Sequence, residues 1–141
     1  MSKGFGLAGI RVGYAMAHPS LVAALDAVRP PGSIASLSVE LAIAALEDPD
    51  RMTKSVAYVT EQREDLASRL IDLGLRPMPS TTNFLLCPTG TDAHRIADEA
   101  RSLGLVIRTF PSGPLTEHLR FTVRAPHEHD RLIASLRRSL R

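Results

Sequence analysis

The stretch SKGFGLAGIRVGY, residues 2–14, places one lysine and one arginine around a glycine-rich loop. Lys3 carries an amine that can form a Schiff base with an aldehyde cofactor. Arg11, eight positions later, carries a guanidinium that can grip a phosphate through two parallel hydrogen bonds. The intervening glycines let the backbone turn tightly, and Ser2 can offer its hydroxyl to the same phosphate. The alternative is a surface lysine in a flexible loop, which composition alone favours.

The composition is that of a globular domain. Of the 141 residues, 44% are hydrophobic and 23% are charged, which is enough to bury a real core. The net charge is only +2, so a general nucleic-acid-binding surface is not indicated. The single cysteine rules out an internal disulfide framework and suits a reducing cytosol. With no membrane-spanning run and no signal-peptide pattern, we expect a cytoplasmic protein that binds neither membranes nor nucleic acids.

The first thirty residues predict a strand and a helix that need a neighbour. Residues 11–17, RVGYAMA, are partly β-branched, which indicates a buried strand. Residues 18–28 indicate a helix with Pro19 in its first turn. A lone buried strand leaves backbone groups unsatisfied. We therefore expect this segment either to pack on the rest of the chain in an unusual way or to join a sheet on further polypeptide.

A helical pattern extends from residue 36 to residue 73 and is broken once. Its apolar stripe is interrupted by Asp48, Pro49 and Asp50. Because proline disrupts a helix interior, two helices or one sharp bend are expected. Gly74 is expected to cap the second helix at its C-terminus.

The remaining residues predict a compact α/β unit, in which short apolar runs alternate with amphipathic stretches. Thr91 or Asp92 is expected to cap the first of its helices at the N-terminus, and Gly104 is expected to end it. The expected strands are 81–89, 105–110 and 119–123, and the expected helices are 92–104 and 126–140.

Three reactive side chains of this unit have a structural interpretation. Cys87, next to Pro88, is interpreted as a small buried strand residue. His127 and His129 stand at the start of the last predicted helix. Because they lack further ligands at helical spacing, they are interpreted as a solvent-exposed first turn rather than a metal site.

Residues 2–14 closely resemble the lysine motif of fold-type I pyridoxal-phosphate enzymes, in the histidinol-phosphate aminotransferase branch of the class I/II aminotransferases. The family pattern is Ser-Lys, small, Phe, small, Leu-Ala-Gly, apolar, Arg, apolar, Gly, aromatic, and every position is filled here. The resemblance implies that Lys3 forms the Schiff base with pyridoxal 5'-phosphate and then shuttles a proton between Cα and the cofactor. It also implies that Arg11 binds the cofactor phosphate, with Ser2 assisting.

The resemblance extends to the substrate side. TTNFLLC, residues 81–87, matches the Asn-Phe strand of the family's small domain and makes Asn83 a candidate neighbour of the active site. In LRFTV, residues 119–123, Arg120 matches the arginine that clamps the substrate's acid group. Arg108 lies where a second substrate-side arginine is common. From the residues alone, Asn83 can equally cap its own loop, and both arginines can lie on a solvated sheet face.

The chain also departs from the family. An aromatic residue and two asparagines usually precede the linking helix, where this chain has Gly32, Ser33 and Ala35. A glycine is common where this chain has Arg124. In the family these positions lie near the substrate-binding end of the site. The departures therefore bear on the identity of the substrate more than on the identity of the cofactor. A decarboxylase of the same fold, of the threonine-phosphate decarboxylase type, is one alternative, and a non-catalytic remnant or interaction module is another.

The resemblance implies an α/β chain in three parts: 1–30 from the end of the large cofactor-binding domain, 31–74 as linking helices, and 75–141 as a small domain with a small mixed or antiparallel sheet. Family members are longer and carry, before the lysine, the aspartate that keeps the cofactor ring protonated. We therefore expect the C-terminal portion of an aminotransferase that passes an amino group to a 2-oxo acid such as 2-oxoglutarate. A homodimer, or association with a separate N-terminal half, is expected, and catalysis by this chain alone is not.

Overall fold

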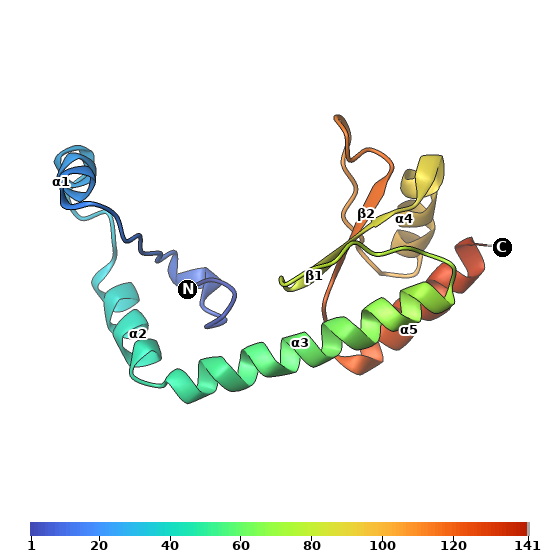
Figure 1. Cartoon of the computed structure of the whole chain (residues 1–141), viewed down its shortest axis with the longest axis horizontal. Coiled ribbons are helices and arrows are strands. Elements are labelled where there is room, and N and C mark those ends of the chain that lie inside the picture. The colour runs from blue at the N-terminus through green and yellow to red at the C-terminus, as the bar shows by residue number, and fades with distance from the viewer. Residues whose placement is uncertain (141) are drawn as a thin grey trace. The chain divides into compact units, whose positions relative to one another are not determined.

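The computed structural model describes residues 1–140, which form two compact units, Met1–Val56 and the residues from Ala57 onward. Figure 1 labels the helices and strands of both units. The second unit packs a small antiparallel sheet against helices, which confirms the predicted α/β class. None of the described helices is both long enough and apolar enough to cross a membrane.

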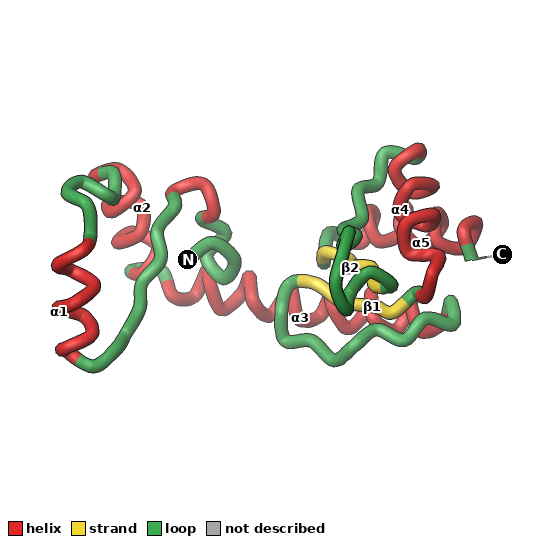
Figure 2. The backbone as a smooth tube through the Cα atoms, turned by 90° about the horizontal axis from the view of Figure 1, so that it is seen from above, coloured by secondary structure: helices red, strands yellow, loops and turns green. Residues whose placement is uncertain are grey.

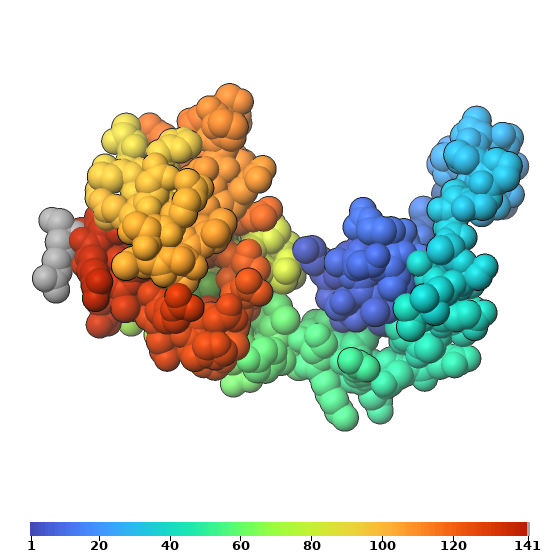
Figure 3. Space-filling model, turned by 180° about the vertical axis from the view of Figure 1, so that it is seen from behind, coloured from blue at the N-terminus to red at the C-terminus, as the bar shows by residue number. Residues whose placement is uncertain are grey.

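The N-terminal unit consists of short helices with little buried surface. It contains η1 (Ala8–Ile10), α1 (Pro19–Val28), α2 (Ser36–Leu46) and the beginning of α3 (Pro49–Asp72). Pro19 occupies the first turn of α1 as predicted, and His18 Nδ1 accepts a hydrogen bond from the Ser20 N–H at 3.4 Å. No residue of α1 is buried, and Figure 3 shows α1 projecting as a lobe of its own. Its apolar stripe, Leu21, Val22, Leu25 and Val28, is exposed.

The strand predicted at residues 11–17 is wrong for the residues that the structure describes. This segment is irregular and is drawn as a loop leading to α1 in Figure 2. Tyr14 and Met16 are 70% and 90% exposed. An extended segment becomes a strand only when a neighbour accepts and donates its backbone hydrogen bonds, and no described residue pairs with it.

The helical pattern of residues 36–73 is divided at the predicted place. Asp48 lies between α2 and α3 and accepts a hydrogen bond from the Arg51 N–H at 3.2 Å, which caps α3. At the other end, Gly74 adopts a φ of 82°. The Gly74 N–H donates to the Ile71 C=O at 2.8 Å and the Leu75 N–H donates to the Leu70 C=O at 3.1 Å. This pattern is a Schellman motif, so the predicted cap is confirmed.

The sheet of the C-terminal unit joins β1 (Phe84–Pro88) to β2 (His118–Thr122) in antiparallel register, with Leu86 opposite Arg120. Side chains alternate between the two faces of each strand. One face is buried against α4 (Ala93–Ser102), α5 (Pro126–Ser139) and the later turns of α3, an arrangement visible in Figures 1 and 2. The largest fully buried side chains of this core are those of Phe121, Leu66, Leu70, Ile96, Leu119, Leu136, His129 and Cys87. The buried position predicted for Cys87 is confirmed.

Residues 105–110, predicted as a strand, form a single β-bridge instead. Arg108 pairs with Arg120 through hydrogen bonds of 3.4 and 3.0 Å in the two directions. Val106 is 84% exposed, while Ile107 is buried in the core. Pro111 and Pro114 follow and lack the N–H that a ladder needs. One bridge therefore replaces the predicted strand.

The outer edge of β1 is covered by the residues that precede it. The Met78 N–H donates to the Leu86 C=O at 2.8 Å. The hydroxyls of Ser80 and Thr82 donate to the Phe84 C=O at 2.7 and 3.1 Å, and the Phe84 N–H donates to Thr82 Oγ1 at 3.3 Å. These bonds fix the position of Phe84 along the sheet edge.

The interpretation of His129 as solvent-exposed is wrong. Its ring is 1% exposed, and its Nε2 accepts a hydrogen bond from the Arg124 N–H at 3.0 Å. The reason is its place on α5, where residues 129, 132, 133 and 136 share the face that enters the core.

Candidate functional site

The N-terminal loop folds tightly around Lys3. The Gly6 N–H donates to the Lys3 C=O at 3.1 Å, which closes a turn, and Gly6 adopts a φ of 68° that favours glycine. Lys3 itself is exposed and Ser2 is half-buried. The loop therefore presents the Lys3 amine at the surface of the unit, beside a hydroxyl.

Arg11 ends the same loop in an unusual backbone conformation. Its φ is 55°, and it is the non-glycine residue with a positive φ among the residues described. Left-handed backbone costs roughly 1 kcal/mol or more for a residue with a Cβ. The guanidinium folds back on the preceding 3-10 turn, where Nη1 donates to the Ala8 C=O at 3.3 Å. Such strain is characteristic of ligand-binding positions.

The charges of this loop have no counter-charge among the residues that the structure describes. Within residues 1–140, neither Lys3 nor Arg11 forms an ion pair with a carboxylate. An amine can attack an aldehyde, and a guanidinium with free donors can bind a phosphate. The donor set therefore fits one molecule that carries both groups.

A pocket of 400 Å³ borders the residues that follow Lys3. It is lined by the turn from Gly4 to Leu7, by apolar residues of α2 and by the first turns of α3. The Gly4 Cα is close to Met52, since a Cβ added there would lie 3.8 Å from Met52 Cγ. Asp48, Arg51 and Ser55 add polar groups to the lining of the pocket.

The predicted substrate-side arginines share one face of the sheet in the C-terminal unit. Because Arg108 and Arg120 form a bridge, their side chains project to the same face. This face is opposite to the core, because Phe121 enters the core and neighbours on a strand alternate. Like charges directly opposite each other destabilise a sheet. The pairing of two guanidiniums therefore favours an anion as their ligand.

Arg120 is held by an aromatic ring rather than by an acid. Its Cζ lies over the Phe84 ring, 5.0 Å from the centroid, within the range of a cation–π interaction. Its Nε is buried and has no hydrogen-bond partner among the described residues. Sequence reasoning missed Phe84, although it directly follows Asn83 in the strand motif, because the contact depends on cross-strand register.

Asn83 lies immediately before β1, and its C=O accepts a hydrogen bond from the Val123 N–H at 2.9 Å. Its side chain is half-buried, and none of the described hydrogen bonds uses it to cap its own loop. The structure thus places Ser2, Lys3 and Arg11 on one loop of the N-terminal unit. It places Asn83, Arg108 and Arg120 on or beside one sheet of the C-terminal unit.

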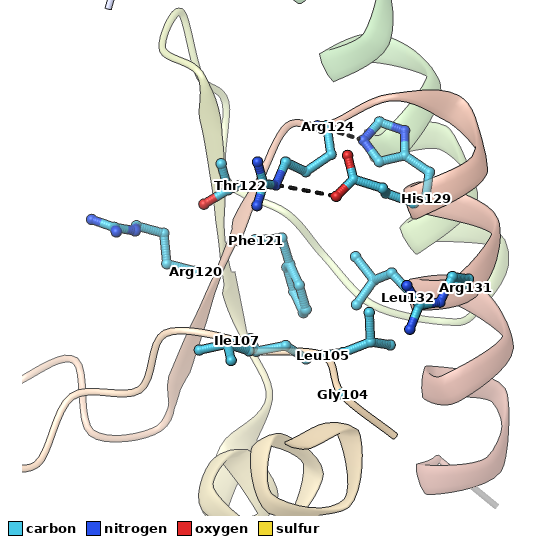
Figure 4. A pocket seen from close by; sticks show the side chains of 12 residues that line it. Gly104, Leu105, Ile107, Arg120, Phe121, Thr122, Arg124, His129, Arg131 and Leu132 are labelled. Carbon is cyan, nitrogen blue, oxygen red and sulfur yellow. Dashed lines mark hydrogen bonds and ion pairs between the residues drawn. The ribbon is translucent and has the colours of Figure 1, made fainter. Parts of the chain in front are cut away.

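A second pocket, of 250 Å³, lies beside β2 (Figure 4). Its lining combines apolar side chains, among them Phe121 and Leu132, with polar ones, among them Arg120 and Thr122. Arg124 pairs with Glu128 at 3.6 Å at its margin. Figure 4 shows the Arg120 side chain on the opposite side of β2 from Phe121, although both residues belong to the lining of this pocket.

Comparison with known proteins gives one consistent group of relatives. The profile of the family described as aminotransferase class I and II matches residues 1–136. The histidinol-phosphate aminotransferase of Granulibacter bethesdensis is 39% identical over 138 residues, which cover 96% of this chain and 37% of that protein. The aromatic amino acid aminotransferase of Mycobacterium avium is 38% identical over 132 residues, covering 94% of this chain and 36% of that protein.

Solved structures agree in fold. The crystal structure of histidinol-phosphate aminotransferase from Sinorhizobium meliloti in complex with pyridoxal-5'-phosphate superposes with a TM-score of 0.89 at 34% identity. The superposition covers 99% of this chain and 39% of that one. This chain therefore spans less than two-fifths of the length of each of these relatives.

Proposed function

Because this chain belongs to the class I and II aminotransferases, we propose that it supplies the lysine and the anion-binding arginines of a transamination that depends on pyridoxal 5'-phosphate. The observation that carries the proposal is the loop of residues 2–11, where an amine and a guanidinium are exposed and pair with no carboxylate of residues 1–140. The S. meliloti relative binds this same cofactor.

Lys3, Arg11 and Ser2 would hold the cofactor. When bound, pyridoxal phosphate supplies an electron sink that stabilises negative charge at the Cα of an amino acid. The Lys3 Nζ would hold the aldehyde, condensing with it as water leaves, and the amine would carry the Cα proton once the amino donor has displaced it. The Arg11 guanidinium binds the phosphate, and the Ser2 hydroxyl adds a donor.

Arg120, Arg108 and Asn83 would bind the substrate. Arg120 would clamp a carboxylate, because a guanidinium offers two parallel donors to two oxygens. Arg108, paired with Arg120, adds positive charge for a second acidic group. We propose a 2-oxo acid such as 2-oxoglutarate as the acceptor. The amino donor remains open, since one relative is named for histidinol phosphate and another for aromatic amino acids.

We propose that catalysis involves further polypeptide, either a second copy of the chain or a separate one equivalent to the part of the relatives that this chain does not match. Two observations of the N-terminal unit support a docking partner. The apolar stripe of α1 is exposed, and the backbone of residues 11–17 has no strand beside it in the described residues. A neighbouring sheet would bury the apolar stripe of α1 and would supply backbone hydrogen-bond partners for residues 11–17.

The cofactor half of the proposal is tested with the chain's two lysines, Lys3 and Lys54. The chain is titrated with pyridoxal phosphate, followed by absorbance, and then reduced with borohydride and mapped by peptides. A specific band and a label on Lys3 are expected, with both lost in Lys3→Ala and kept in Lys54→Ala. Equal labelling of the two lysines would contradict a cofactor site on this loop.

The reaction is tested by adding the part of the G. bethesdensis relative that this chain does not match. Formation of glutamate from 2-oxoglutarate and an amino donor is expected, and Lys3→Ala is expected to abolish it. Release of carbon dioxide from the donor without glutamate formation would instead show the decarboxylase alternative. No reaction of either kind, with the two polypeptides associated, would favour a non-catalytic role.

A further inference from the structure

We propose that Phe84 is a positioning residue, whose ring holds the Arg120 guanidinium in place to receive an oxyanion. The proposal rests on the proposed function, in which Arg120 binds the acid group of the substrate. It adds a residue that neither the lysine motif nor the arginine positions point to.

The register places Arg120 in close contact with β1. Both main-chain groups of Arg120 bond to Arg108, so its position opposite Leu86 is a non-hydrogen-bonded one. Side chains approach most closely at such positions. Phe84 stands two residues from Leu86 on the same face, within diagonal reach of a long side chain. The measured separation of 5.0 Å between Arg120 Cζ and the ring centroid follows from this register.

Arg120 has no acidic partner within residues 1–140, whereas five other arginines have one. Its buried Nε makes no hydrogen bond to a described residue, although a buried polar group normally has a partner. The attraction to the ring face leaves the N–H donors available for oxygens. The arginines that do pair with carboxylates are Arg29, Arg69, Arg95, Arg101 and Arg124.

Both backbone polar groups of Phe84 are hydrogen-bonded to the residues that precede it. Its C=O accepts from the hydroxyls of Ser80 and Thr82, and its N–H donates to Thr82 Oγ1. On the other side, the Asn83 C=O accepts from the Val123 N–H. A ring on a backbone held from both sides gives the guanidinium a rigid support, which is what a binding group needs to be preorganised.

The expected effect is modest and measurable. Loss of a cation–π contact of this kind corresponds to a change of about two- to fivefold in an equilibrium constant. Phe84→Leu is therefore expected to weaken binding of 2-oxoglutarate to the chain about two- to fivefold. Phe84→Tyr keeps the ring and is expected to bind as the unsubstituted chain does.

The experiment combines two readouts by nuclear magnetic resonance on the full 141-residue chain. The first is the order parameter of the Arg120 Nε–H vector, and the second is the shift of that signal on titration with 2-oxoglutarate. Phe110→Leu is the matched control, since it makes the same exchange at a half-buried ring outside the sheet pair. Thermal unfolding is recorded for each variant, so that a loss of fold is recognised.

The support for the proposal would be a lower order parameter and weaker binding in Phe84→Leu, rescue in Phe84→Tyr, and no change in Phe110→Leu. An unchanged order parameter in folded Phe84→Leu would overturn it, whatever happens to the anion. Arg120→Gln separates the two ideas. If that variant binds 2-oxoglutarate as the unsubstituted chain does, the substrate role of Arg120 fails, while a reduced order parameter in Phe84→Leu still shows that the ring holds the guanidinium.

Discussion

Lowering the pH is expected to destabilise the C-terminal unit through one residue, His129. Its ring is 1% exposed, and burial holds the pKa of its imidazole below the ordinary value of 6.5. Asp65 opposes this change, but its Oδ2 is 3.7 Å from Nδ1, which is too far for a hydrogen bond. The Nε2 atom accepts the Arg124 N–H at 3.0 Å, so it cannot also carry a proton without losing this bond.

The sign follows from the two protonation states. Below about pH 6.5 the imidazole of the unfolded chain binds a proton, while the folded one stays neutral until the pH reaches its lowered pKa. The unfolded state therefore binds more protons in this window, and the free energy of unfolding falls as the pH falls. For one site the slope is at most about 1.4 kcal/mol per pH unit. Above about pH 6.5 the imidazole is neutral in both states, so the contribution of His129 to the free energy of unfolding is fully present.

The substitution His129→Ala is expected to lower the free energy of unfolding by about 2–4 kcal/mol at pH 8. It removes a buried ring and leaves the Arg124 N–H without a partner. The difference in free energy of unfolding between the variant and the unsubstituted chain should shrink as the pH falls below 6.5. The reason is that the unsubstituted chain then loses the stability that neutral His129 supplies.

The measurement is urea unfolding between pH 5.5 and pH 8, followed through the methyl resonances of Leu132 and Leu136, which belong to the core of this unit. His94→Ala, at an exposed histidine of α4, is the control and should run parallel to the unsubstituted chain. If His129→Ala and the unsubstituted chain lost stability equally steeply below pH 6.5, the assignment of the pH dependence to His129 would be refuted.

Three other perturbations test separate features. Gly104→Ala is expected to lower the free energy of unfolding by about 1 kcal/mol, because residue 104 has a φ of 74°. Gly13→Ala, where φ is not positive, should change it by less than about 0.5 kcal/mol, and urea unfolding compares the two. Arg11→Gly is expected to keep stability within about 1 kcal/mol, since relief of the left-handed strain is offset by the freedom of the unfolded glycine. The same variant should weaken cofactor binding in the absorbance titration, and unchanged binding would remove Arg11 from the phosphate site. Cys87 is fully buried, and burial raises the pKa of its thiol, so Ellman's reagent should react with it only after unfolding in urea. Equally fast reaction of the folded chain would contradict its buried position.

The helices could be predicted from the sequence because their signals are local. Apolar spacing, the break at Asp48 and Pro49, and the glycines that end α3 and α4 each act within a few residues. Residues 11–17 carry an equally good strand pattern but remain irregular, because a strand depends on partners that no local pattern reports. Residues 105–110 illustrate the same limit, with one bridge formed at Arg108.

The candidate site likewise has one part that local sequence predicts and one part that depends on contacts between distant residues. Lys3 and Arg11 could be proposed from one contiguous motif, and their roles stay predictions. The contact between Phe84 and Arg120 joins residues 36 positions apart through strand register, so spacing could not show it. The burial of His129 was readable in principle, since it stands three and four positions before Leu132 and Ile133 on the apolar face of α5. The polar character of the first turn concealed that signal.

The covering of β1 by residues 78–82 has a consequence for self-association. An uncovered strand edge invites pairing with the edge of another molecule, which is how aggregates and fibrils begin. Here the carbonyls of Phe84 and Leu86 are already occupied, and the segment that occupies them presents Pro77 and Pro79 on either side of Met78. Prolines have no N–H to extend a ladder. The outer edge of this small sheet is thereby closed to growth, so pairing of chains at this edge is disfavoured.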